Sequence, residues 1–124
     1  MSKERLFIFD TTLRDGAQTQ GVDFSVNDKE KVAFALDKLG VDYIEGGWPG
    51  ANPTDTEFFQ KKHNFINAKL TSFGMTKKTG RSADNDPGLS ALLNSNTPAV
   101  CLVGKSWDFH VDIALGISNE ENLE

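Results

Sequence analysis

Short apolar runs and helical patterns alternate along the chain. The runs that predict strands cover residues 5–9, 41–45, 69–73 and 99–103. The first run, Arg-Leu-Phe-Ile-Phe, has no alternation of polar and apolar residues, which predicts a strand buried on both faces, as in a parallel sheet.

The segment between the first two runs has a helical pattern. Ser25 offers an N-cap, Asp28 stands in an acidic first turn, and apolar residues recur near helical spacing until Gly40, which is expected to end the helix. A strand pattern restarts directly after Gly40, so strand, helix and strand follow one another with the short connections of a β/α unit.

Further helices are expected between and after the later runs. Asn52 and Pro53 predict the start of a helix that runs toward Asn67. Another is expected over residues 82–93, with a break or a late start at Pro87. Weaker helical patterns follow over residues 107–117 and 118–121.

This alternation predicts an α/β fold with about four β/α units, the first half of a TIM (β/α)8 barrel. A complete barrel needs about 250 residues, and this chain has 124. A flavodoxin-like open sheet is the competing architecture, but it usually has a fifth strand and a glycine-rich phosphate loop after the first one. The loop here reads Thr-Leu-Arg-Asp-Gly instead.

Charge and composition exclude several classes of partner. The formal net charge is −5 and no basic cluster stands out, which argues against nucleic acid or an anionic membrane surface. No apolar run approaches the roughly 18 residues that a membrane span needs. The N-terminus lacks a signal-peptide pattern and the single Cys101 cannot form an internal disulfide, so we expect a cytoplasmic protein.

Polar residues gather where the first two predicted strands end. Asp10, Arg14 and Asp15 follow the first strand, and Glu45 ends the second. Reactive groups of parallel barrels lie at the carboxyl ends of strands. An arginine beside carboxylates can bind an oxo acid, and a carboxylate oxygen can bind a hard divalent cation.

The segment Asp-Thr-Thr-Leu-Arg-Asp-Gly-Ala-Gln, residues 10–18, resembles the signature of the isopropylmalate, homocitrate and citramalate synthases, which are relatives of hydroxymethylglutaryl-CoA lyase. Residues 44–53, 72–74 and 104–108 look most similar to the citramalate synthase branch. The resemblance implies an acyltransferase of isoleucine and leucine biosynthesis that condenses acetyl-CoA with pyruvate to give citramalate and CoA. It also implies a divalent metal ion, Mg²⁺, Mn²⁺ or Zn²⁺.

The same resemblance implies roles for individual residues. Asp15 matches a carboxylate ligand of the metal, and Arg14 a catalytic, substrate-binding cation beside the keto oxygen. Glu45 matches a catalytic carboxylate that orients Arg14 or a water molecule, and Gln18 matches a supporting glutamine at the substrate. Asp10 either caps the loop or forms hydrogen bonds behind the site.

This resemblance predicts that residues 1–124 are the N-terminal half of the catalytic barrel, with the remaining barrel, a linker and a regulatory domain absent. The family completes its metal site with a His-x-His pair on a later strand, and neither His63 nor His110 forms such a pair. We therefore expect weak metal binding and no activity from this chain alone. Unpaired sheet edges predict self-association into a homo-oligomer.

Three alternatives remain open from the sequence. The first is an isopropylmalate or homocitrate synthase, which differs in the keto acid. The second is a lyase of the hydroxymethylglutaryl-CoA type. The third is a structural half-barrel module without catalytic activity.

Overall fold

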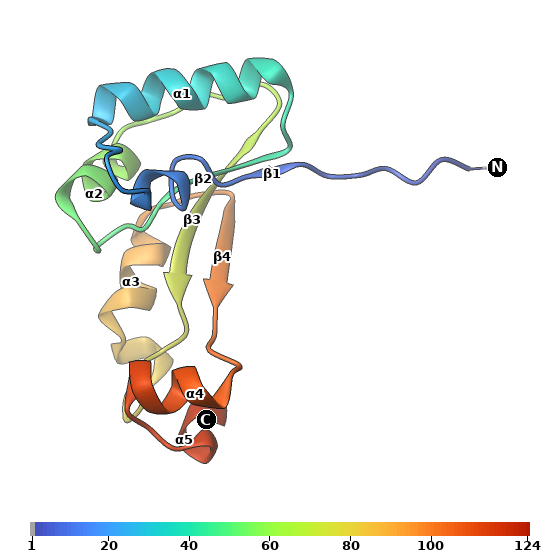
Figure 1. Cartoon of the computed structure of the whole chain (residues 1–124). Helices are drawn as coiled ribbons and strands as arrows, with labels where there is room; N and C mark the ends of the chain where they lie inside the picture. The colour runs from blue at the N-terminus through green and yellow to red at the C-terminus, as the bar shows by residue number, and fades with distance from the viewer. Residues whose placement is uncertain (1) are drawn as a thin grey trace.

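The computed structural model describes residues 2–124 and contains a four-stranded parallel sheet (Figure 1). Its strands lie in the order β1-β2-β3-β4, so each strand pairs with the next one along the chain. The strands are β1 Phe9–Asp10, β2 Tyr43–Gly47, β3 Lys69–Met75 and β4 Ala99–Val103. The predicted α/β fold with sequential β/α units is confirmed.

The helices follow the strands in the expected alternation. They are α1 Val26–Leu39, α2 Pro53–Gln60, α3 Pro87–Asn94, α4 Asp108–His110 and α5 Asn119–Leu123. Short 3-10 turns cover Gly16–Gln18 and Ala83–Asn85, and a π turn covers Val111–Leu115. In Figure 1, α4 and α5 lie beyond the carboxyl ends of β3 and β4.

Local capping signals determine where α1 begins and ends. The Ser25 side chain accepts from the backbone N–H of Asp28, and the Asp28 carboxylate accepts from the backbone N–H of Ser25. This reciprocal capping satisfies N–H groups that have no partner within the helix. Gly40 ends the helix at φ 94°, in the left-handed region that glycine adopts without strain.

The core lies between the sheet and helices α1 and α2. Its buried apolar side chains come from the loop after β1, from both helices, from β2 and β3, and from the segment just before β2. They are Leu13, Ala33, Val41, Ile44, Phe58, Phe59 and Leu70. On the neighbouring part of the sheet, α3 packs so closely on β3 that a Cβ at Gly74 would lie 2.5 Å from Leu92.

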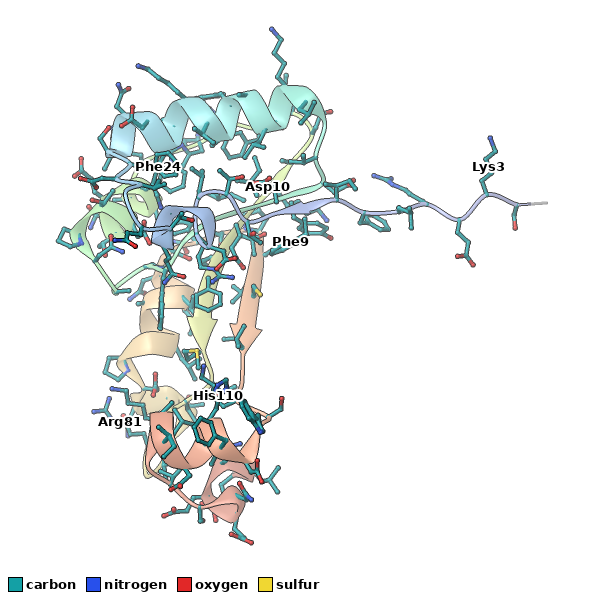
Figure 2. The ribbon with its side chains drawn as sticks, viewed as in Figure 1. Lys3, Phe9, Asp10, Phe24, Arg81 and His110 are labelled. Atoms are coloured by element: carbon teal, nitrogen blue, oxygen red, sulfur yellow. The ribbon has the colours of Figure 1, made fainter. Side chains whose placement is uncertain are left out.

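The prediction that residues 5–9 form a strand buried on both faces is wrong. Only Phe9 and Asp10 pair with β2, and Leu6, Phe7 and Ile8 are more than half exposed. Figure 2 shows this segment leaving the body of the molecule, with Lys3 far from the sheet. The physical reason is that residues 6–8 precede the two residues that pair with the sheet, so the sheet and its helices do not bury them.

The second helix is shorter than predicted, because it ends at Gln60 instead of Asn67. Residues 66–68 form a bend outside any helix, and the carboxylate of Asp37 on α1 accepts three backbone N–H bonds from them. The third helix starts late, as Pro87 predicted, with Asp86 as its N-cap.

Candidate active site

The loop after β1 places Arg14 over the carboxyl end of the sheet. The backbone N–H groups of Arg14, Asp15 and Gly16 all donate to the carbonyl of Thr11, at 3.2, 2.8 and 3.1 Å, which closes the loop into a tight turn. Arg14 Nε then donates to Glu45 Oε1 at 2.5 Å. Glu45 lies within β2, two residues before the strand ends, and is 1% exposed, so its carboxylate has little access to solvent.

The guanidinium of Arg14 is also supported from below. Its Cζ lies 4.2 Å from the centre of the Phe73 ring on β3, a distance at which a cation is attracted to the ring face. Trp48 packs edge-on against Phe73 at 5.1 Å between ring centres. These contacts hold the guanidinium in place, and its Nε is taken by Glu45.

Asp15 and Gln18 both lie near those terminal nitrogens. Arg14 Nη1 is 3.4 Å from Asp15 Oδ1 and 3.4 Å from Gln18 Oε1, so both contacts are long. The Asp15 side chain is 68% exposed. The structure thus brings Arg14, Glu45, Asp15 and Gln18 together, from a loop and a strand that are 27 or more positions apart in sequence.

Asp10 takes the loop-capping position. Its carboxylate accepts from the backbone N–H of Thr12 at 2.9 Å and from the Thr12 hydroxyl at 3.1 Å. The sequence left two roles open for Asp10, and these bonds correspond to the capping role. They stabilise the turn that carries Arg14.

Cys101 on β4 belongs to the same surface, which sequence reasoning did not anticipate. It is half-buried and pairs in register with Phe73, so its side chain shares the sheet face over which Arg14 lies. Burial raises the pKa of the Cys101 thiol, and the neighbouring Glu45 carboxylate raises it further. The sequence carries no signal for this position, because the face that Cys101 shares with Phe73 depends on the register between β3 and β4.

The end of β2 is held by a buried ion pair that sequence reasoning also missed. Lys29 of α1 contacts Asp55 of α2, and both side chains are nearly inaccessible to solvent. Lys29 Nζ also donates to the carbonyl of Gly46 at 2.7 Å, and Asp55 accepts from the backbone N–H of Trp48 at 2.8 Å. A lysine within a helical pattern carries no sequence signal for such burial.

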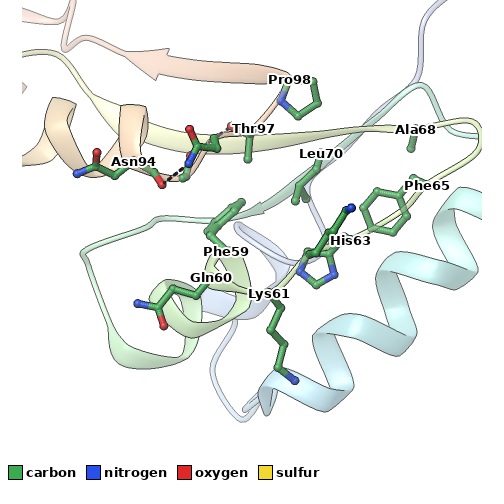
Figure 3. A pocket seen from close by; sticks show the side chains of 13 residues that line it. Phe59, Gln60, Lys61, His63, Phe65, Ala68, Leu70, Asn94, Thr97 and Pro98 are labelled. Carbon is green, nitrogen blue, oxygen red and sulfur yellow. Dashed lines mark hydrogen bonds between the residues drawn. The ribbon is translucent and has the colours of Figure 1, made fainter.

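Two cavities lie at opposite ends of the strands. One of about 310 Å³ is lined by Arg14, Gln18 and Trp48, beside the residues described above. The other, of about 490 Å³, is lined by residues that precede β3 and β4 (Figure 3). Its His63 donates a 2.7 Å hydrogen bond from Nε2 to the Phe58 carbonyl and stacks on the Phe58 ring, so it serves packing.

Residues 2–124 contain no group of three His, Cys, Asp or Glu side chains placed to hold a metal ion. Among the same residues, no helix has the length and apolar character to cross a membrane.

The sequence model of one protein family, described as HMGL-like, matches residues 5–124. The chain belongs to the HMGL-like family. Two solved structures support the fold: it superposes on a hydroxymethylglutaryl-CoA lyase from Pseudomonas aeruginosa with a TM-score of 0.73 over 96% of the chain, at 20% identity. The match to the lyase from Bacillus subtilis has a TM-score of 0.71 at 17% identity.

Within this family, the chain is more similar in sequence to some members than to others. It is 53% identical over 122 residues to a protein of Aquifex aeolicus named (R)-citramalate synthase, and 49% identical over 119 residues to one of the same name from Sulfolobus acidocaldarius. It is 35% identical to 2-isopropylmalate synthase 1 of Caldanaerobacter subterraneus. The chain spans 23% of the length of the first two relatives and 39% of the Pseudomonas lyase.

Proposed function

We propose that residues 1–124 form the N-terminal half of the catalytic barrel of a citramalate synthase, an acyltransferase that condenses acetyl-CoA with pyruvate. The contact between Arg14 and the buried Glu45, beside a cavity at the carboxyl ends of the strands, is the observation that supports this most. The identities of 44–53% to proteins named (R)-citramalate synthase, against 35–36% to isopropylmalate synthases, favour pyruvate as the keto acid.

In this proposal Arg14 binds the keto acid. Glu45 takes its Nε, which leaves the terminal nitrogens to donate to the carboxylate and keto oxygen of pyruvate. A base removes a proton from the methyl group of acetyl-CoA, and the resulting carbanion attacks the keto carbon, whose oxygen gains negative charge and finally takes up a proton. Arg14 stabilises that charge. Water then cleaves the thioester, which yields citramalate and free CoA.

A divalent cation, Mg²⁺, Mn²⁺ or Zn²⁺, is part of the proposal, and Asp15 fits one ligand position. Its carboxylate is largely exposed, and within residues 2–124 its hydrogen-bond and ion-pair contacts are limited to the long one with Arg14, so its oxygens can accept a hard cation. When bound, such an ion polarises a carbonyl as a Lewis acid. One carboxylate does not complete a site, so we expect weak metal binding and no synthase activity from the chain alone.

The test uses a protein in which residues 1–124 are continued through the remaining strands, either by the natural continuation or by the remainder of the Aquifex relative. We call this protein the completed barrel. CoA release from acetyl-CoA is measured with pyruvate, 2-oxoisovalerate and 2-oxoglutarate under Mg²⁺ or Mn²⁺. We expect pyruvate to be preferred, Asp15→Ala to abolish release, and Arg14→Lys to lower kcat by about 100-fold or more.

The matched control is Asp112→Ala, which removes an exposed carboxylate far along the chain from the site and should leave the rate unchanged. Preference for 2-oxoisovalerate or 2-oxoglutarate would move the assignment to an isopropylmalate or homocitrate synthase. Absence of CoA release with every keto acid would contradict the proposal and favour a lyase or a structural module.

Two coarser expectations accompany this function. A biosynthetic enzyme of this kind acts on small soluble substrates, so we place it in the cytoplasm. We also propose that residues 1–124 by themselves form a homo-oligomer, because Val100 and Leu102 on the edge strand β4 are 47% and 53% exposed. An apolar surface of this kind favours association with another chain.

A further inference from the structure

A buried ion pair lies behind the end of β2, outside the contact between Arg14 and Glu45. Lys29 is 1% exposed and Asp55 is 8% exposed, and the ammonium also lies 5.5 Å from the centre of the Phe58 ring. Burying two charges is expensive, and such a pair is weak evidence for stability by itself. The geometry that it holds therefore gives the better explanation of its presence.

That geometry is an irregularity in the β2–β3 ladder. Glu45 pairs with Thr71 and Gly47 with Ser72, so Gly46 has no place in the register. The Gly46 carbonyl instead accepts the 2.7 Å hydrogen bond from Lys29 Nζ. Bulges of this kind redirect the side chains next to them and occur beside active sites.

Asp55 holds the other side of the bulge. Its Oδ2 accepts from the backbone N–H of Trp48 at 2.8 Å, while its Oδ1 contacts Lys29. A Cβ added at Gly47, where φ is +146°, would lie 2.6 Å from the Asp55 carboxyl carbon. The carboxylate is thus pressed against the backbone at a position that glycine alone can occupy without strain.

The two side chains next to this bulge both position Arg14. Glu45 directly precedes it and accepts from Arg14 Nε, and Trp48 follows it and packs on the Phe73 ring over which Arg14 lies. We propose that Lys29 and Asp55 are positioning residues that set the β2 bulge and thereby the orientation of the Arg14 guanidinium. The catalytic part of this inference rests on the proposed function.

The first test measures the kinetics of variants in the completed barrel. Asp55→Asn and Lys29→Met each break the buried pair, and the double variant removes both charges. The matched control is Glu30→Gln, which breaks the exposed ion pair of 3.0 Å between Glu30 of α1 and Lys61, the residue directly after α2. The folded fraction of each protein is measured by circular dichroism.

We expect kcat/KM for the keto acid, corrected to folded enzyme, to fall by about 30- to 100-fold in all three variants. KM should rise at least threefold, whereas mere loss of folded protein lowers the rate and leaves KM unchanged. The double variant should regain thermal stability relative to the single ones without regaining kcat/KM. A double variant with control-like kcat/KM would overturn the proposal.

The second test needs no activity. Trp48 is observed by fluorine NMR after incorporation of 5-fluorotryptophan, and its resonance is identified by its loss in Trp48→Phe. We expect the resonance to shift in Asp55→Asn and in the double variant, and to stay in place in Glu30→Gln. An unmoved resonance would refute the positioning role.

The outcomes separate this inference from the proposed function. If the unmodified completed barrel releases no CoA with any keto acid, the proposed function fails, and the fluorine resonance alone decides whether the pair sets the bulge. If it is active and the variants match the control, the positioning role fails and the proposed function stands.

Discussion

Asp37 should stabilise the turn into β3 through its charge, and its replacement gives the sharpest test of the fold. The carboxylate is 6% exposed and accepts backbone N–H bonds from Ile66, Asn67 and Ala68 at 2.9, 2.8 and 2.8 Å. Hydrogen bonds to a charged group contribute about 1.5–3 kcal/mol each. Ile66 is 92% exposed, so water replaces part of what is lost. We expect Asp37→Ala to lower the free energy of unfolding by about 3 kcal/mol.

Asp37→Asn should have roughly half that effect, about 1.5 kcal/mol, because an amide oxygen keeps the two bonds made by Oδ1 without their charge. The assay is urea unfolding followed by far-UV circular dichroism at one fixed protein concentration. The matched control is Asp112→Asn, on an exposed carboxylate, which should change stability by less than about 0.5 kcal/mol.

The pH dependence separates charge from shape at this position. Burial alone would raise the pKa of Asp37, but the three backbone N–H groups more than offset it, and the pKa is lowered. A lowered pKa adds stability that is present above the unfolded value of about 3.9 and is lost as pH falls through the folded value. The gap between the parent and Asp37→Asn should therefore shrink below about pH 4. A gap that is independent of pH, or one under 0.5 kcal/mol at pH 7, on the order of the control, would refute the reasoning.

Three further predictions concern the site and the open sheet. Gly47→Ala should destabilise the protein by clearly more than Gly80→Ala. Both glycines have positive φ, but only a Cβ added at Gly47 would lie against Asp55. Urea unfolding of both variants measures the difference. The raised pKa of Cys101 predicts that its alkylation by iodoacetamide reaches half the maximal rate at a higher pH than the alkylation of a free thiol does. Glu45→Gln should lower the pH of that midpoint. A midpoint that Glu45→Gln leaves unchanged would count against the interaction between Glu45 and Cys101. The chain should also self-associate at micromolar concentration in sedimentation velocity, and a strictly monomeric species would contradict this expectation.

The ends of the helices were predictable because capping depends on neighbours in sequence. Ser25 and Asp28 lie three positions apart and satisfy each other, so their pattern sufficed to start α1. Pro87 likewise delayed α3 as expected. The second helix ended earlier than predicted because Asp37, on another helix, accepts hydrogen bonds from the backbone N–H groups of residues 66–68. No local sequence pattern reveals this contact.

The candidate site likewise contains residues whose positions follow from local sequence and residues whose positions depend on tertiary structure. The motif after the first strand determined by itself that Arg14 and Asp15 would stand at the carboxyl end of the sheet, since a tight turn on Thr11 needs only adjacent residues. Tertiary structure alone decided that Phe73 supports Arg14 and that Cys101 lies beside Glu45, because strand register sets which side chains share a face.

Burial of charge and exposure of apolar residues were likewise decided in three dimensions. Lys29 lies in a helical pattern typical of a surface lysine, and only the packing of α2 against α1 pairs it with Asp55. The apolar run at residues 6–8 predicts a core strand, but it precedes the residues that pair with the sheet and stays exposed. Sequence specifies which groups a segment offers. Whether a group is paired or covered depends on elements distant in sequence, and only the folded arrangement brings those elements together.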